Sequence, residues 1–310
     1  TVEGMGTALP GPPIGTSELL RHIDAHFGLT LSRRGAALAR RLGVGTRHIS
    51  RDLRARTEQP RAIDANAALA ARAVTAALCE SKRGVDEVRY LIAHTATPAT
   101  WLPPGVTAVA EHLGYTGPCV ELRQACTGFA NALVFARGLA DGLADGVAVI
   151  VGSETGSTFF DPLRAAACDA QLINMLQMGD GAAAVVLSGR RMEGSCLQRL
   201  YYGHSGRGRA PGFMLAAGAR EFAHDYASVR QYGAELFRSA LAAAQALGIS
   251  LSEVDWLIPH QANGHMARLL GDDLGFDPDR IHVNADRVGN TSSAAIWLAL
   301  AELRPRMRPG

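Results

Sequence analysis

A cysteine, a histidine and an asparagine, each at the predicted junction of two secondary-structure elements, could together carry out thioester chemistry. Cys126 follows a predicted strand over residues 119–122 and opens a predicted helix, where the positive end of the helix dipole favours the thiolate. His260 follows an apolar run, and Asn290 precedes a helix whose first turn is rich in hydroxyl groups. Forming and resolving a thioester requires such a set: a nucleophile, a proton carrier or hydrogen-bond donor, and a neutral donor.

Each of these residues also has an ordinary structural explanation when it is considered alone. Most free cysteines are structural, a histidine can be satisfied by backbone groups in a core, and Asn-Thr-Ser is common at helix caps. His260, however, stands at the carboxyl end of a predicted strand, where α/β folds place working side chains. No CxxC pair accompanies the histidines, so no metal site is expected. The occurrence of all three residues at element junctions favours the catalytic interpretation.

Two glycine-containing segments give further predictions about the backbone. Gly128, one turn into the helix after Cys126, is expected to allow the close approach of another backbone segment. The segment Met178-Gly179-Asp180-Gly181-Ala182 precedes a predicted strand and is expected to form a tight turn. Because no helix follows this turn, we expect its glycines to supply positive φ angles rather than a phosphate site.

Short apolar runs alternate with helical patterns along the chain, which indicates an α/β fold. The predicted strands cover residues 90–93, 147–151, 182–187 and 256–258, and the predicted helices cover residues 64–80, 126–142, 227–247, 263–271 and 291–304. The polar stretch Ser188-Gly189-Arg190-Arg191 separates two alternating portions. We therefore predict two related halves, residues 1–188 with Cys126 and residues 189–310 with His260 and Asn290.

The composition excludes several classes of protein. The chain has 310 residues, of which 47% are hydrophobic and 19% charged, so it can bury a large core and is not disordered by composition. It contains no apolar run of the roughly 18 residues that a membrane span needs, and no basic-then-apolar leader. Its five cysteines form no CxxC pair, which argues against zinc and disulfides and fits a reducing compartment. A cytoplasmic protein is expected, and the net charge of +2 gives no reason to propose nucleic acid.

Arginine is concentrated in one early segment. Nine arginines lie there against only two acids, Asp52 and Glu58; they are Arg33, Arg34, Arg40, Arg41, Arg47, Arg51, Arg54, Arg56 and Arg61. Two interpretations stay open: a solvated helical face, or a docking face for a polyanion such as coenzyme A phosphates or an acidic carrier protein.

Several motifs resemble those of the ketoacyl-acyl-carrier-protein synthase III family, a branch of the thiolase-like enzymes. They are Thr46-Arg47-His48-Ile49, Ala125-Cys126-Thr127-Gly128-Phe129, Gly179-Asp180-Gly181-Ala182, Pro259-His260-Gln261-Ala262-Asn263 and Gly289-Asn290-Thr291-Ser292. They occur in the family's order and near its spacing, so the resemblance covers essentially the whole chain. The run Pro-His-Gln-Ala followed by Asn is the most specific of them.

The resemblance implies a thiolase-like five-layer αβαβα fold, usually in a homodimer, with no permanently bound cofactor. It implies that Cys126 carries the acyl group, and that His260 and Asn290 hydrogen-bond the thioester carbonyl of a malonyl extender. Acyl-CoA or acyl carrier protein would deliver the substrates. Arg41 matches a family arginine near the coenzyme A entrance, and the segment around Leu102 matches a loop that enters the partner subunit's acyl pocket.

The chain departs from the family pattern at several positions. Ala37 stands where the family often has an adenine-stacking tryptophan, and His265 stands where an arginine usually lies beside the carrier-protein entrance. The segment over residues 159–177 also differs and is longer. These departures favour a specialised acyl donor, such as a carrier-bound acyl group, over acetyl-coenzyme A. After the last helix the family continues with two strands and a glycine-rich loop that helps line the active site. Either the natural chain extends beyond Gly310 or it lacks this loop, and we expect the longer chain because an unpaired sheet edge would be a liability.

Four functions compete on the sequence alone. The first is decarboxylative condensation with a malonyl-carrier-protein extender, which the presence of Asn290 favours. The second is an acyltransferase of secondary metabolism that passes the Cys126 acyl group to a hydroxyl, amine or carrier thiol. The third is a cysteine hydrolase, because the separation of Cys126 and His260 falls in the roughly 130–150 residues of papain-like proteases, although their signature around the cysteine is absent. The fourth is a non-catalytic scaffold, which would predict a degraded set of catalytic residues.

Overall fold

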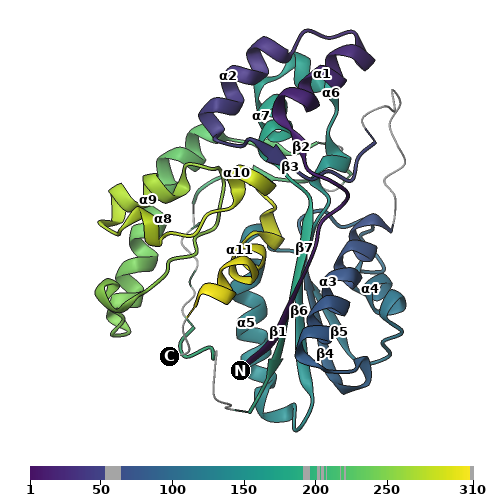
Figure 1. Ribbon diagram of the computed structural model, residues 1–310, viewed down its shortest axis with the longest axis vertical. Helices are drawn as coiled ribbons and strands as arrows, with labels where there is room; N and C mark the ends of the chain where they lie inside the picture. Colours follow the sequence, from purple (N-terminus) through teal and green to yellow (C-terminus); the bar gives the residue numbers. More distant parts are fainter. Residues whose placement is uncertain are drawn as a thin grey trace.

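The computed structural model describes residues 1–307 except 53–63, 191–195, 201–202, 204–205, 207, 217 and 220. Its centre is a five-stranded mixed sheet with helices on both faces (Figure 1). Within these ranges, no helix is both long enough and apolar enough to cross a membrane.

The sheet has the strand order β1-β7-β6-β4-β5. Its strands are β1 (Val2–Ala8), β4 (Val88–His94), β5 (Cys119–Leu122), β6 (Val147–Glu154) and β7 (Gly181–Ser188). Strand β4 pairs in parallel with β5 and β6, while β7 runs antiparallel to both β6 and β1. The strands predicted from apolar runs over residues 90–93, 147–151 and 182–187 are confirmed. Strand β5, which leads to Cys126, is an edge strand only four residues long.

Alternate residues of the central strands supply two separate hydrophobic layers, as the two-residue period of a strand requires. Val147, Val149 and Val151 of β6 face α3 (Ala65–Ser81) and α4 (Val106–Leu113). Ile150, on the same strand, faces the opposite layer, formed by α5 (Gly128–Leu139) and α11 (Ala295–Leu303). The α/β fold is confirmed, and α5 and α11 place the segments after Cys126 and Asn290 side by side over one face (Figure 1).

A second, mainly helical body lies at one end of the sheet (Figure 1). It consists of α1 (Thr16–Phe27), α2 (Ser32–Leu42), α6 (Pro162–Ala167) and α7 (Asp169–Gln177), with the short pair β2 (Ile14–Gly15) and β3 (Thr46–Arg47) beneath them. Its core contains Leu19, Leu20, Ile23, Leu172 and Phe222, all almost completely buried. The differing segment over residues 159–177 belongs to this body.

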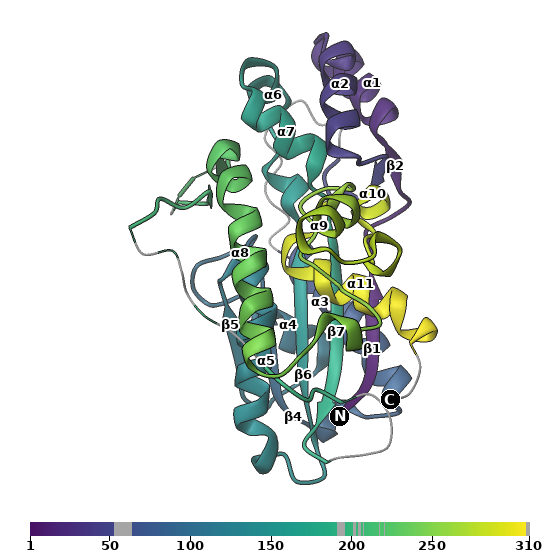
Figure 2. The same ribbon diagram turned by 90° about the vertical axis from the view of Figure 1, so that its left-hand side faces the viewer.

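The C-terminal part packs beside α11 and α10 (Ala285–Val288) and contains α8 (Tyr226–Ala246) and α9 (Met266–Leu274), as Figures 1 and 2 show. A short pair, β8 (Phe213–Met214) and β9 (Ala223–His224), precedes α8. The strand predicted over residues 256–258 is wrong as a regular strand: Leu257 makes one parallel bridge to Ile281. Two backbone hydrogen bonds form it, from Leu257 N to Arg280 O and from His282 N to Leu257 O.

The predicted helices exist, but their starts are displaced near the proposed site. The helix predicted over residues 291–304 begins at Ala295, because Ser292 has a φ of 45° and opens a 3-10 turn over Ser292–Ala294. The helix predicted from residue 263 begins at Met266. The Asn263 side chain accepts a hydrogen bond from His265 N in the turn that precedes it. The division of the chain into two related halves at about residue 189 stays a prediction.

Candidate active site

Cys126 lies in a 3-10 turn over Ala125–Thr127 that joins the edge strand β5 to helix α5. The helix begins two residues later, at Gly128, so the thiol stands just before it rather than at its first residue. A Cβ at Gly128 would come within 2.7–3.0 Å of the His94 ring. The close approach expected there therefore involves a side chain and not another backbone segment. His94 is neutral, because burial lowers its pKa to about 3.

Cys126 contacts two side chains from the distant C-terminal part of the chain. It is hydrogen-bonded to His260, and its Sγ lies 3.4 Å from Ser292 Oγ. Burial raises the pKa of the Cys126 thiol, but the charge and hydrogen bond of His260 and the hydroxyl of Ser292 outweigh burial and lower it. Burial lowers the pKa of His260, whereas the charge and hydrogen bond of Cys126 raise it above its ordinary value. The two shifts favour a thiolate–imidazolium pair.

The other four cysteines have no comparable environment. Cys79, Cys119, Cys168 and Cys196 are free thiols, and burial raises the pKa of Cys119. Across the part of the chain that the structure describes, no group of three or more His, Cys, Asp or Glu side chains is arranged to hold a metal ion. Cys126 is thus the cysteine whose surroundings lower its pKa.

His260 is positioned by its neighbour Gln261, which is almost completely buried. The Gln261 side-chain oxygen accepts hydrogen bonds from the backbone N–H groups of Asn284 and Ala285, at 2.7 and 3.0 Å. Its amide nitrogen donates to the carbonyl of His282 at 3.3 Å. These bonds connect the segment after His260 to the segment that leads into α10, and so to Asn290.

Asn290 is joined by its backbone to the turn before β7. Asn290 N donates to Gln177 O at 2.8 Å, and Gly179 N donates to Asn290 O at 3.1 Å. A Cβ at Gly179 would lie 1.9 Å from Val288 O, which no side chain could tolerate. The expectation of positive φ in the Gly-Asp-Gly segment was wrong, because the residues with positive φ include neither Gly179 nor Gly181. Gly179 is required for close backbone contact instead.

The side chain of Asn290 is oriented by a hydrogen bond of its own. Asn290 Oδ1 accepts from Ser292 N at 3.0 Å. Because the carbonyl oxygen is engaged in this way, the amide nitrogen is the part of the side chain that remains to donate to another molecule. This orientation agrees with a donor role for Asn290.

Two buried carboxylates brace the surroundings of the site. Glu154, at the end of β6, accepts hydrogen bonds from Ala96 N at 2.7 Å, Thr97 Oγ1 at 2.6 Å and Ser293 N at 3.2 Å. Burial raises its pKa. Asp180 accepts from the backbone of Ser50 and from the backbone and hydroxyl of Ser157. Each carboxylate joins segments far apart in sequence, and Glu154 reaches the turn that contacts Cys126.

Two of the substrate-binding candidates lie on neighbouring elements. Arg41 is exposed near the end of α2, and the ring of His265 packs on Gly43 just beyond it. The His265 ring nitrogen lies 3.2 Å from Arg40 O. The structure therefore brings Arg41 and His265 to the same region of the surface.

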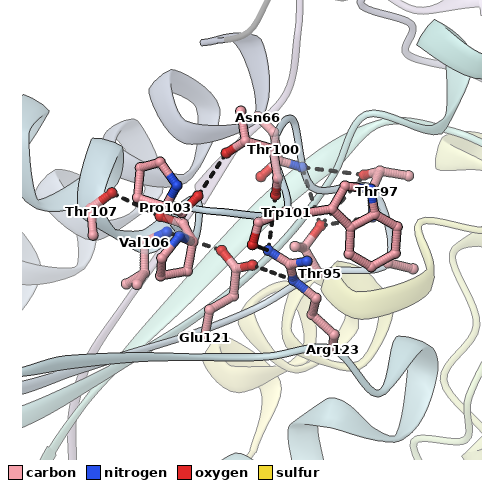
Figure 3. A network of polar contacts seen from close by, with 12 residues as sticks. Asn66, Thr95, Thr97, Thr100, Trp101, Pro103, Val106, Thr107, Glu121 and Arg123 are labelled. Carbon is pink, nitrogen blue, oxygen red and sulfur yellow. Dashed lines mark hydrogen bonds and ion pairs between the residues drawn. The ribbon is translucent and has the colours of Figure 1, made fainter. Parts of the chain in front are cut away.

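Leu102 lies elsewhere, on the loop between β4 and α4, with 85% of its surface exposed. Figure 3 shows how this loop is held. Arg123 donates to the carbonyls of Thr100 and Trp101 at 2.9 and 3.1 Å, and to Glu121 at 2.8 Å. The Arg123 guanidinium also lies 5.2 Å from the centre of the Trp101 ring. An ordered loop thus presents an apolar tip.

The arginine-rich segment does not form a single exposed face. Arg47 is completely buried and donates to Thr16 Oγ1 at 2.7 Å, and burial lowers its pKa to about 10. Arg34 pairs with Asp169. Arg33, Arg40 and Arg41 are exposed. Arg54, Arg56 and Arg61 lie outside the described residues. Among the described arginines of this segment, those exposed on α2 stay candidates for a docking face.

Comparisons with known proteins identify the family of this chain. The model of the family "3-oxoacyl-[acyl-carrier-protein (ACP)] synthase III" matches residues 120–205, which include Cys126. The model of that family's C-terminal domain matches residues 244–310, which include His260 and Asn290. A beta-ketoacyl-acyl-carrier-protein synthase III of Ruegeria is 30% identical over 300 residues, which cover 93% of this chain and 87% of the relative. The chain belongs to the 3-oxoacyl-acyl-carrier-protein synthase III family.

Other family members match with similar coverage. The synthase III of Rhodospirillum centenum is 28% identical over 96% of this chain and 88% of its own. The crystal structure of the synthase III of Pseudomonas aeruginosa superposes with a TM-score of 0.79 at 28% identity, covering 98% of this chain and 89% of that one. A tetronic acid condensing enzyme has the same fold, with a TM-score of 0.80 at 24% identity over 99% and 92% of the two chains. The thiolase-like fold of the family is therefore confirmed for this chain.

Two residues of the site were not predicted from the sequence. Ser292 enters the sequence prediction only as part of a hydroxyl-rich helix start and of the Gly289-Asn290-Thr291-Ser292 motif, and the sequence predicts no role for Glu154. Ser292 follows Asn290 by two residues, a spacing that could have suggested a shared turn. The position of Glu154 depends on the pairing of β6 within the sheet, and no local pattern indicates it.

Proposed function

We propose that this chain condenses an acyl group held as a thioester on Cys126 with a malonyl group on an acyl carrier protein, releasing carbon dioxide. The observation that carries the proposal is the interaction between Cys126 and His260, because each group shifts the pKa of the other toward a thiolate and an imidazolium. Asn290, with its side-chain oxygen occupied by Ser292 N, adds a second donor. The relatives that match over most of their length are named as synthases of this class.

The first half-reaction loads the acyl group. The Cys126 thiolate attacks the carbonyl carbon of the acyl donor, and a new C–S bond forms as the donor's C–S bond breaks. The departing thiolate takes a proton, for which the His260 imidazolium is the adjacent source. The products are acyl-Cys126, the free donor thiol and a neutral His260.

The second half-reaction forms the carbon–carbon bond. Loss of carbon dioxide from the malonyl thioester leaves an enolate, whose oxygen accepts hydrogen bonds from His260 and Asn290. The enolate carbon attacks the acyl carbonyl of Cys126, and the thiolate of Cys126 departs. One proton taken up from solvent returns His260 to its charged form, so charge and atoms balance over the cycle.

The substrates would reach Cys126 from the side where Arg41 and His265 lie. Arg41 is an exposed cation suited to a phosphate of coenzyme A or of a carrier's prosthetic arm. Leu102 would enter the acyl pocket of a second subunit in a homodimer. Its exposure at the tip of an ordered loop supports this role.

Intact-protein mass spectrometry with a series of acyl-CoA and acyl-carrier thioesters tests the proposal. An accepted donor should add one acyl mass, and peptide mapping should find it on the peptide that contains Cys126. Cys126→Ala should show no added mass with the same donor. Acylation of Cys79, Cys119, Cys168 or Cys196 in the wild-type protein would refute the assignment.

A further inference from the structure

The turn after Asn290 brings a second polar side chain to the sulfur of Cys126. Ser292 Oγ lies 3.4 Å from Cys126 Sγ, and Ser292 is only 5% exposed. This distance is within the range of a hydrogen bond to sulfur, and either atom could be the donor. The Ser292 hydroxyl and His260 both act on the pKa of Cys126, the reacting group.

The backbone on both sides of this contact adopts an uncommon conformation. Ala125, which precedes Cys126, has a φ of 47°, and Ser292 has a φ of 45°. Among the residues that the structure describes, only four residues other than glycine have positive φ, and two of the four flank this one contact. Such backbone angles persist only where the surroundings enforce them, and they are concentrated at functional sites.

Specific hydrogen bonds enforce the conformation. Ser292 N donates to Asn290 Oδ1 at 3.0 Å, and Ser293 N donates to the buried Glu154 at 3.2 Å. The Ser293 hydroxyl donates to Ala125 O at 3.3 Å, which joins the two turns directly. The site is therefore built to hold the Ser292 hydroxyl against the sulfur.

The direction of the contact depends on the charge of the sulfur. A thiolate carries no hydrogen and can only accept, so the Ser292 hydroxyl must be the donor whenever Cys126 is ionised. A hydrogen bond to a charged acceptor is about twice as strong as one between neutral groups. An acylated sulfur is neutral and accepts weakly, so the hydroxyl stabilises the ionised state selectively.

We propose that Ser292 is a further catalytic residue, which donates a hydrogen bond to the Cys126 sulfur in the two steps where that sulfur carries negative charge. This inference rests on the proposed role of Cys126 as the acylated nucleophile. The first step is the attack of the free thiolate on the acyl donor, and the second is its departure when the new carbon–carbon bond forms. The hydroxyl keeps its hydrogen throughout. Decarboxylation, where the charge lies on the enolate oxygen, does not involve Ser292.

The pH dependence of Cys126 alkylation by iodoacetamide tests the inference without any acyl or malonyl substrate. Wild type is compared with Ser292→Ala and Ser292→Gly, and the site of labelling is verified by peptide mapping. The glycine variant accommodates the positive φ and so remains folded even where alanine is strained. Thr291→Val is the matched control, because the buried Thr291 hydroxyl has no hydrogen-bond partner among the described residues.

Both Ser292 variants should raise the alkylation midpoint by about one pH unit, the loss of one hydrogen bond to a charged group. At pH 7 the rate should fall about threefold, because a more basic thiolate is more nucleophilic and offsets part of the loss. In the Ser292 variants, acyl loading should slow by a similar factor, whereas malonyl decarboxylation should stay within about twofold of wild type. Thr291→Val should change neither the alkylation midpoint nor the alkylation rate.

Unchanged midpoints in folded Ser292 variants would overturn the inference. Labelling of a different cysteine in wild type would refute the proposed function instead.

Discussion

The turn that carries Cys126 lies between a strand and a helix of the sheet core, whereas the turns that carry His260 and Asn290 belong to no sheet. Strand β5 pairs with β4, and helix α5 packs on the face of the sheet through Ala132, Leu133 and Ala136. The segments that carry His260 and Asn290 are instead held by isolated β-bridges, one at Leu257 and one at Asn290 itself. Side-chain and backbone hydrogen bonds complete their support.

This difference separates two ways of positioning a catalytic group. The proposed nucleophile, Cys126, is placed by hydrophobic burial, which also stabilises the whole domain. The proposed donors, His260 and Asn290, are placed by polar and close backbone contacts, in which Gly179 and Gln261 take part. Substitutions on the donor side should therefore reduce catalysis more than they reduce the stability of the sheet.

The largest effect is expected for His260→Ala. Removal of one of two donors to the enolate should lower malonyl decarboxylation by roughly 10²–10³. The thermal unfolding midpoint should stay close to that of wild type, since the sheet core is untouched. Stopped-flow or isotope-release assays of carbon dioxide, together with circular dichroism melts, measure both quantities. Decarboxylation at the wild-type rate would contradict the donor role of His260.

Gly179→Ala should have a smaller but still large effect. The new methyl group would collide with Val288 O, so the Gly289–Asn290 backbone must move away from the turn before β7. We expect a loss of about tenfold or more in decarboxylation, because misplacement of a donor by about 1 Å can cost up to 10². Acylation of Cys126 should be affected less.

Gly138→Ala provides the control for this glycine substitution. Gly138 lies in α5, where a Cβ would meet nothing within 4 Å. Alanine there should leave activity unchanged and raise stability by about 0.5–1 kcal/mol, the difference between the two residues in a helix. Equal activity losses in both variants would show that glycine substitution acts through general destabilisation.

A still smaller effect concerns the pH dependence of Cys126. Since the pKa of Cys126 is lowered and that of His260 is raised, the thiolate should persist below the ordinary thiol pKa of about 8.5. Without His260, burial acts on the Cys126 thiol unopposed by the histidine's charge, so His260→Ala should move the alkylation midpoint upward.

Glu154→Gln should have the opposite effect on the midpoint. It removes a negative charge that raises the pKa of Cys126, and so it should move the midpoint downward by less than about one unit. Iodoacetamide labelling between pH 5 and 10 measures all three midpoints, and a wild-type midpoint above that of His260→Ala would contradict the assignment.

The sequence indicated the sheet-borne side of the site better than the donor side. Apolar runs predicted β4, β6 and β7 because a buried strand must be apolar on both faces. The run at Leu257 looked the same, yet it forms only one bridge, because strand length depends on neighbours that are remote in sequence. Their residue types at predicted element junctions identified Cys126, His260 and Asn290 as candidates before any family resemblance, and the structure brings Cys126 and His260 close enough to shift each other's pKa.

Local patterns failed where the cause was a contact between distant segments. Gly179 was expected to provide positive φ, and its actual requirement is the nearby Val288 carbonyl. Arg47 was grouped with surface arginines, although packing buries it completely against Thr16. The role of Ser292 could not be predicted from its capping sequence, because its positive φ and its contact with Cys126 arise only when α5 and α11 meet.

The most direct test of the account uses Asn290→Ala with an acyl donor and malonyl carrier protein. Condensation needs two donors for the enolate, whereas simple acyl transfer forms no enolate and needs only a base. Wild type should release one carbon dioxide for each ketoacyl product. The variant should lose most of this release while acyl-Cys126 still forms and persists in the intact-protein mass spectrum. An ester, amide or transferred thioester formed by wild type with no carbon dioxide released would contradict the account.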